Sequence, residues 1–234
     1  MIKRRLDKFL IRNKLKLTAN LPGAKLDISN PTISDTIRGY IARNKYEAEE
    51  YNLISTSLKP EDIVLEVGAG MGYISCICGK ILNDSRNLHV YEANPKLIEI
   101  IDTNKRLNGL DFHTYNALLG SYNGKSDFYI PDDFWAASMV PLDNAEKFEI
   151  DVVNIVDVMN KIKPSYLVMD IEGAEVDVLP SMDLSGIHTI CLEVHPHKAQ
   201  AERIRDMFSF LLDQGFMFDF NKYDLVFLFR KSSN

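Results

Sequence analysis

The chain has 234 residues, of which 46% are hydrophobic, and this length and composition allow one ample domain with a sizeable core. The net charge of -6 argues against nucleic acid as the main partner, and no apolar run approaches the length that spans a bilayer. The N-terminus lacks the apolar middle region of a secretory signal, so we expect a cytoplasmic protein.

The charge is uneven along the chain. Residues 1–17 hold seven basic side chains and one acid, Asp7, with Leu6 and Phe9–Ile11 between the charges. This pattern fits a helix that packs its apolar stripe on the body, and it also fits contact with an anionic membrane surface. Residues 1–58 are expected to form a helical and loop extension with breaks at Pro22 and Pro31. Residues 1–40 are also candidates for a dimer contact.

A regular alternation of strands and helices follows in residues 59–234, which we expect to form one domain. The run IVLEV, residues 63–67, is typical of a strand buried on both faces. The predicted elements after it are, in order, helix 73–82, strand 87–93, helix 95–109, strand 110–118, helix 155–162, strand 165–171, helix 174–182, strand 187–195, helix 201–215 and strands 216–220 and 225–230.

An insertion at about 120–152 interrupts this rhythm. Residues 125–131 and 147–155 are predicted to be two antiparallel strands, with a looser segment between them. The two closing strands are joined by only four residues, 221–224, and must therefore be antiparallel to each other. The expected fold class is α/β, a mostly parallel sheet with one antiparallel strand near the C-terminus and helices on both faces. This architecture departs from the double βαβαβ unit that binds dinucleotides.

The stretch VLEVGAGMGYIS, residues 64–75, places a glycine-rich turn between a strand and a helix. Such a turn brings bare backbone close to a ligand at the carboxyl edge of the sheet. The spacing is G-x-G-x-G, and Tyr73 stands where the dinucleotide fingerprint has its third glycine, so the loop favours S-adenosylmethionine over NAD. Glu92, at the end of the next strand, suits two ribose hydroxyls; the alternative is an acid that faces solvent.

The segments VLEVGAGMGYIS, VYEANP, NALLG, LVMDIEGAEVDVL and CLEVHP occur in the order found in the FkbM-type S-adenosylmethionine-dependent methyltransferases. The resemblance covers residues 46–230. It implies a seven-stranded Rossmann-like sheet and methyl transfer to oxygen, often to a sugar hydroxyl. Two departures are Glu66, where many members have Asp, and the loop Gly70-Met71-Gly72, where Asn is common nearby. Both departures are tolerable, because a carboxylate and the glycines are kept.

The resemblance also implies the residues that bind the cofactor. The methionine portion would be lined by Glu66, Gly68, Ala69, Gly70, Met71 and Gly72, with Tyr73 closing that side. Glu92 would bind the ribose, and the adenine would be bordered by Ala93, Asn94, Asn116 and Ala117. An equally good reading of Asn116 is a turn residue that bonds its own backbone.

Acids and a histidine follow the fourth and fifth predicted strands. A sugar hydroxyl is a poor nucleophile, so a base should take its proton. His195 is the first candidate because imidazole titrates near neutral pH. Asp170 is the second, as base or as a contact of the cofactor amine, while Glu172 or Glu193 would orient His195. Glu175 is expected to cap the next helix, and helix capping is also the alternative for Asp170.

The same residues allow a metal, although we do not favour it. Asp170, Glu172 and His195, or His195 with His197, offer oxygen and nitrogen ligands at no spacing specific for a metal. Candidate substrate contacts are Trp135 and Ser138 in the insertion and Tyr46 and Glu47 before the core.

The expected function is methyl transfer from S-adenosylmethionine to a hydroxyl of a sugar or glycan, with no nucleic-acid partner. A non-catalytic subunit that binds this cofactor and an NAD-dependent oxidoreductase are the alternatives.

Overall fold

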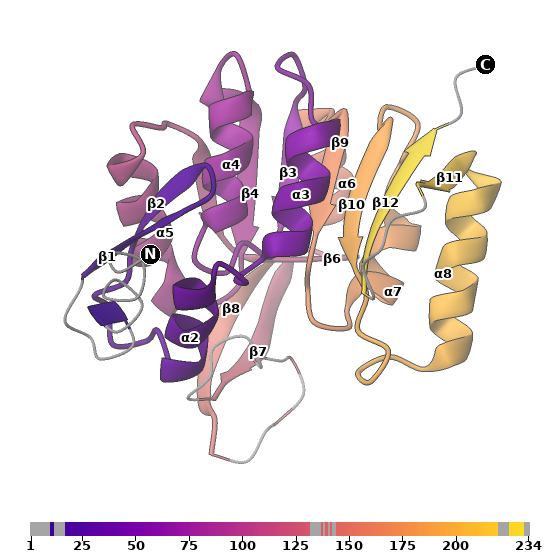
Figure 1. Cartoon of the computed structure of the whole chain (residues 1–234). Coiled ribbons are helices and arrows are strands. Elements are labelled where there is room, and N and C mark those ends of the chain that lie inside the picture. Colours follow the sequence, from indigo (N-terminus) through magenta and orange to yellow (C-terminus); the bar gives the residue numbers. More distant parts are fainter. Residues whose placement is uncertain are drawn as a thin grey trace.

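The computed structural model describes residues 10–11, 17–131, 137, 139, 141, 144–219 and 225–231, and its centre is a seven-stranded sheet (Figure 1). The strand order is β11-β12-β10-β9-β3-β4-β5. All neighbours pair in parallel except β12, which is antiparallel to both β10 and β11. The predicted sheet with one antiparallel strand near the C-terminus is therefore confirmed. The bounds are β3 Val64–Val67, β4 Leu88–Glu92, β5 His113–Asn116, β9 Tyr166–Met169, β10 Thr189–Glu193, β11 Phe216–Asp219 and β12 Val226–Lys231.

Two hydrophobic clusters fill the two sides of this sheet. One joins α3 (Ala48–Ser57), α4 (Tyr73–Ile81) and α5 (Pro95–Leu107), and the other joins α6 (Ile155–Ile162) and α8 (Ala201–Asp213). The alternation of strands and helices explains this layering, since each helix crosses one face of the sheet before the next strand begins. The central strands β3 and β9 are buried along their whole length, as their apolar runs predict.

The predicted helix 174–182 is shorter than expected. Only α7, Glu175–Val178, is α-helical, and Leu179–Ser181 continues as a 3-10 turn, η3. Pro180 accounts for the change, because proline has no N–H for the helical hydrogen bond.

The N-terminal segment differs from the prediction of helix and loop. Thr18–Leu21 (β1) and Ala24–Asp27 (β2) form an antiparallel hairpin, with Gly23 in the left-handed region at φ +76°. Alternate side chains, Ala19 and Leu21 on one strand and Ala24 and Leu26 on the other, are buried, which is the period of a strand. Further along the segment, α2 at Asp35–Arg43 and α3 are helical as expected.

The hairpin, α2 and α3 share one hydrophobic cluster with α4 and α5. The division at residue 58 stays a prediction, as does the role of the basic arm, because residues 1–9 and 12–16 lie outside the described part of the chain. No helix among the described residues is both long and apolar enough to cross a bilayer.

The insertion forms a separate three-stranded sheet of order β6-β8-β7, drawn below the main sheet in Figure 1. Its strands are β6 (Leu118–Gly120), β7 (Gly124–Ile130) and β8 (Glu146–Asn154). The predicted antiparallel pairing of the two long strands is confirmed, and β6 adds to them in parallel. The predicted strand 110–118 therefore ends early, and Ala117 separates β5 from β6.

Candidate functional site

A cavity of about 1000 Å³ lies at the carboxyl ends of the parallel strands, where ligands bind in open α/β sheets. Its walls come from residues 45–50, the ends of β3, β4, β9 and β10, and the insertion. Eleven residues singled out from the sequence line it: Tyr46, Glu47, Gly68, Gly70, Glu92, Ala93, Asn94, Ala117, Asp170, Glu172 and Glu193. Nine others lie outside the lining: Glu66, Ala69, Met71, Gly72, Tyr73, Asn116, Glu175, His195 and His197.

The glycine loop brings three parts of the chain together. A Cβ on Gly68, which has φ +82°, would lie 1.7 Å from the backbone oxygen of Asp170. A Cβ on Gly70, at φ +52°, would lie 3.0 Å from Tyr46 Oη and 3.3 Å from Glu47 Oε1. Because neither glycine has a side chain, Asp170 and the turn at residues 46–47 can approach the loop closely. The backbone of both glycines lines the cavity wall.

Two other residues of the loop, Met71 and Tyr73, pack beneath the cavity wall. Met71 and Tyr73 are fully buried, and the Tyr73 hydroxyl donates to the backbone oxygen of Pro22 at 2.8 Å. Asn104 of α5 donates to Met71 O at 2.9 Å and accepts from Asp27 N at 2.7 Å. The loop is thus tied through α5 to the N-terminal hairpin.

Glu92 faces the glycine loop at the cavity wall. Its Oε2 accepts the backbone N–H groups of Ala69 and Gly70 at 3.0 Å each, and its Oε1 accepts that of Asn94 at 2.7 Å. Burial raises the pKa of Glu92, although these hydrogen bonds oppose the rise. The carboxylate fixes the loop and keeps acceptor capacity for a ligand, since each oxygen can accept more than one bond.

Residues beyond Glu92 divide between the cavity and the scaffold. Ala93, Asn94 and Ala117 line the cavity. Asn94 also caps α5 by accepting the N–H of Lys96 at 3.0 Å. Asn116 is exposed and donates to the backbone oxygens of Glu92 and Ala93 at 2.8 and 3.0 Å, so its amide ties two strand ends together and does not reach the cavity.

Glu66 lies within β3, one residue before the strand end. It is 1% exposed, and its Oε2 is buried with no hydrogen-bond partner in the described part of the chain. Burial raises its pKa to about 8. Glu66 lies outside the cavity lining, and the neighbouring Ser75 hydroxyl opposes the rise of its pKa.

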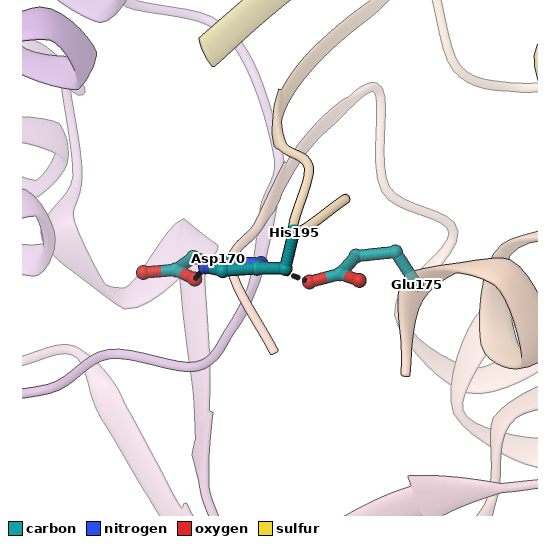
Figure 2. A group of neighbouring side chains, drawn as sticks. All are labelled: Asp170, Glu175 and His195. Atoms are coloured by element: carbon teal, nitrogen blue, oxygen red, sulfur yellow. Dashed lines mark hydrogen bonds and ion pairs between the residues drawn. The ribbon is translucent and has the colours of Figure 1, made fainter. Parts of the chain in front are cut away.

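Asp170, His195 and Glu175 form a row in which the imidazole lies between two carboxylates (Figure 2). His195 Nδ1 is 3.0 Å from Glu175 Oε1, and His195 Nε2 is 3.6 Å from Asp170 Oδ1. Asp170 lines the cavity, whereas the His195 side chain is 7% exposed and lies behind it. The Asp170 Oδ1 atom is buried without a hydrogen-bond partner among the described residues.

Glu175 lies in the first turn of α7 but does not cap it as predicted, because the N-cap is Ala174 and no side chain caps the helix. Its Oε1 accepts the N–H groups of Ile171 and Gly173 at 3.2 and 3.1 Å as well as bonding His195. Burial opposes ionisation, but the hydrogen bonds from His195 and Gly173 outweigh it and lower the pKa of Glu175. Glu175 is therefore an ionised acceptor that holds the ring of His195.

Further carboxylates crowd the same end of the cavity. Burial, with the charges of Glu172, Glu50 and Glu47, raises the pKa of Asp170 well above its ordinary value. Burial and the neighbouring Asp170 and Glu50 raise the pKa of Glu193 to about 10. Glu172 adopts φ +56° and pairs with Lys198 Nζ at 2.5 Å.

Three cavity acids escaped the sequence analysis: Glu49, Glu50 and Asp177. Glu50 is 8% exposed and lines the cavity. The helical spacing in the sequence could have revealed the position of Glu50. Leu53 and Ile54, three and four residues further along the same helix, are both buried, so Glu50 shares their face of α3. Trp135 and Ser138, the predicted substrate contacts, lie outside the described residues.

Several donors in this site could hold a cofactor or a metal. The glycine edge with Glu66 and Glu92 offers carboxylates and backbone for the amino-acid and ribose parts of a nucleoside cofactor. One ligand atom from each of Asp170, Glu175 and His195 lies within 4.8 Å of the others, a spacing that one cation could bridge.

Comparison with known proteins gives one family match. The sequence model of the methyltransferase FkbM domain matches residues 42–218. No curated protein is similar enough in sequence to match this chain.

Comparison with solved structures gives matches of low sequence identity. Trm5b from Pyrococcus abyssi is 12% identical with a TM-score of 0.48, and the alignment covers 90% of this chain but 54% of that one. The ribosomal protein L11 methylase from Lactobacillus delbrueckii subsp. bulgaricus is 13% identical with a TM-score of 0.46, over 80% of each chain. Sp1610 from Streptococcus pneumoniae, crystallised with S-adenosyl-L-methionine, is 10% identical with a TM-score of 0.46, over 80% of this chain and 73% of that one.

Proposed function

Because this chain belongs to the FkbM methyltransferase family, it is an S-adenosylmethionine-dependent methyltransferase, and we propose that it methylates a hydroxyl of a sugar or glycan. The observation that carries the proposal is the ring of carboxylates at one end of the cavity: Glu47, Glu50, Asp170, Glu172 and Glu193. Carboxyl groups accept hydrogen bonds from hydroxyls and, when protonated, also donate to them, so this ring suits an acceptor rich in hydroxyls.

The cavity residues fit the cofactor. S-adenosylmethionine supplies an activated methyl group on a cationic sulfur, and the buried, unpartnered oxygens of Glu47 and Asp170 at the cavity wall favour positive charge. Gly68 and Gly70 leave the wall free of side chains, and Glu92 lies beside them. The volume of about 1000 Å³ is at the upper end for single-ligand sites, which suits a donor and an acceptor together.

We assign the proton transfer to Asp170, because its side chain lines the cavity and that of His195 does not. The raised pKa gives ionised Asp170 a higher proton affinity than an ordinary aspartate, and the positive charge of the bound cofactor favours that ionised form. Methyl transfer forms a carbon–oxygen bond, breaks the carbon–sulfur bond and releases the hydroxyl proton, which Asp170 accepts. In this arrangement His195 and Glu175 are positioning residues. His195 lies behind Asp170 at 3.6 Å, and Glu175 fixes the ring of His195.

The test separates donor binding from transfer. S-adenosylmethionine binding is measured by calorimetry on the wild-type chain, Glu92→Ala and Asp170→Asn, and transfer is followed with labelled methyl on sugars, glycans, peptides and RNA. We expect label on a sugar hydroxyl, lost binding in Glu92→Ala, and about 10² to 10⁴-fold slower transfer with binding kept in Asp170→Asn. Label on peptide or RNA and on no sugar would overturn the acceptor assignment.

A further inference from the structure

The backbone of Glu47 adopts a conformation that favours glycine. Glu47 has φ +44° and ψ +41°, in the left-handed region, at the N-cap of α3. A residue with a side chain is strained there, and such strain is kept mainly at functional sites. The Glu47 side chain makes no capping hydrogen bond to the helix that follows it. Helix capping therefore does not explain the strained backbone, and we look for the reason at the cavity.

The Glu47 carboxylate lies against the glycine loop. Its Oε1 is 3.3 Å from the position that a Cβ on Gly70 would take, and both residues line the cavity. Tyr46 Oη accepts the N–H of Met71 at 3.5 Å and donates to the Glu47 side chain. The buried tyrosine hydroxyl therefore joins the carboxylate to the loop and fixes its direction.

The other oxygen of this carboxylate has no partner. Glu47 Oε2 is buried and makes no hydrogen bond among the residues that the structure describes. Burial, and then the charges of the acids Glu50, Glu66 and Glu193, raise the pKa of Glu47 well above its ordinary value, although the hydrogen bond from Tyr46 opposes the rise. A buried carboxylate oxygen in acidic surroundings is costly unless a positive charge or a proton satisfies it. Glu47 is therefore suited to a cationic group of the ligand.

S-adenosylmethionine carries two cationic groups, the sulfonium and the α-ammonium of its methionine part. The ammonium has three N–H donors and the sulfonium has none, so the ammonium matches an oxygen that lacks a hydrogen bond. The resemblance implies Glu66 for the methionine part, but Glu66 lies outside the cavity lining. Glu92 also contacts the loop, but it already accepts three backbone N–H groups. Glu47 is thus the carboxylate beside Gly70 that keeps an oxygen for the ammonium.

We propose that Glu47 binds the α-ammonium group of S-adenosylmethionine, and that Tyr46 is the residue that positions its carboxylate. The sequence suggested both residues as contacts of the acceptor, whereas this contact places them at the cofactor. A bound ammonium group favours the ionised form of Glu47, because the opposite charges attract each other in a buried site. The proposal rests on the cofactor of the proposed function and not on its acceptor.

The experiment compares two ligands by calorimetry on the full chain. S-adenosylhomocysteine keeps the ammonium without the sulfonium charge, and 5′-methylthioadenosine lacks the whole amino-acid part. We expect Glu47→Gln to bind S-adenosylhomocysteine about 10 to 100-fold more weakly than the wild type, and to bind 5′-methylthioadenosine within about 2-fold of it. Tyr46→Phe should show the same selective loss at about 3 to 10-fold. Glu99→Gln, exposed on α5 and outside the cavity lining, is the matched control and should bind both ligands like the wild type.

Glu47→Gly is a second variant that should keep the fold, because glycine tolerates the positive φ. It should show the same selective loss as Glu47→Gln, and circular dichroism checks that each variant is folded. Unchanged affinity of folded Glu47→Gln for S-adenosylhomocysteine would overturn the proposal, as would an equal loss for both ligands. A loss with S-adenosylmethionine and none with S-adenosylhomocysteine would place Glu47 at the sulfonium and overturn it too.

These outcomes are separate from the test of the acceptor. A folded wild-type chain that binds none of these ligands would overturn both the ammonium contact and the proposed function. Methyl transfer to an acceptor other than a sugar would refute the proposed acceptor and leave the contact of Glu47 with the cofactor unchanged.

Discussion

At the scale of single residues, Gly68 shows how closely the site is built. The distance of 1.7 Å between its ideal Cβ and the backbone oxygen of Asp170 leaves no room for any side chain. The neighbouring atom is backbone, which cannot rotate away as a flexible side chain does. The glycine therefore sets the distance between the loop and the acid that we assign as base.

We predict that Gly68→Ala lowers the free energy of unfolding by about 3 kcal/mol or more, because the clash adds to the cost of a positive φ. The matched control is Gly109→Ala: Gly109 has φ +69° but nothing within 4 Å of its Cβ position. It should cost only about 1 kcal/mol. Urea denaturation of both variants measures the difference, and equal losses would contradict the prediction.

At the scale of elements, α5 connects the N-terminal hairpin to the glycine loop. The buried amide of Asn104 bonds Asp27 of β2 on one side and Met71 of the loop on the other. Both bonds join segments that are far apart in the sequence. The hairpin is therefore part of the support of the cofactor wall.

We predict that Asn104→Ala lowers the free energy of unfolding by about 2 to 4 kcal/mol, because it leaves two backbone groups unpaired. It should also weaken S-adenosylmethionine binding by loosening the loop. Thr103→Ala on the same helix is the control and should change stability by less than about 0.5 kcal/mol. Urea denaturation measures the loss of stability, and calorimetry measures the cofactor affinity. An unchanged affinity would show that the hydrogen bonds of Asn104 are not needed to keep the loop in its binding conformation.

At the scale of the whole molecule, the cavity collects buried carboxyl groups with raised pKa values. Glu66 titrates at about 8 and Glu193 at about 10 in the folded chain, far above ordinary carboxyl groups. The folded chain therefore keeps protons that the unfolded chain releases as the pH rises above about 4.5. These groups therefore make stability fall with rising pH, and they outweigh the smaller opposite effect below about pH 6.5 of His89, whose pKa burial lowers to about 4.

We predict that, without cofactor and in the presence of EDTA, the free energy of unfolding falls by about 2 kcal/mol or more between pH 5.5 and 7.5. Glu66→Gln removes one of the groups and should make the decline shallower by about 1 kcal/mol per pH unit. Urea denaturation at a series of pH values measures both slopes. Stability that rises with pH in this interval would contradict the raised pKa values.

The sequence by itself determined the sheet, its antiparallel strand, the two long strands of the insertion and the position of the glycine loop. Apolar runs, helical periodicity and strand–helix alternation are local patterns, and a parallel sheet brings all its strand ends to one edge. It therefore also placed Asp170, Glu172 and Glu92 at the cavity. The hairpin β1–β2 was missed although its alternation is visible, because its strands are only four residues long.

Only the tertiary structure decided which side chains reach the cavity and which lie behind it. His195 and Asn116 follow strand ends just as Asp170 does, yet the first is buried behind Asp170 and the second bonds backbone outside the cavity. Glu50 reaches the site from a helix far away in the sequence. These outcomes depend on packing between distant segments, and the raised pKa values follow from that burial, which no local pattern encodes.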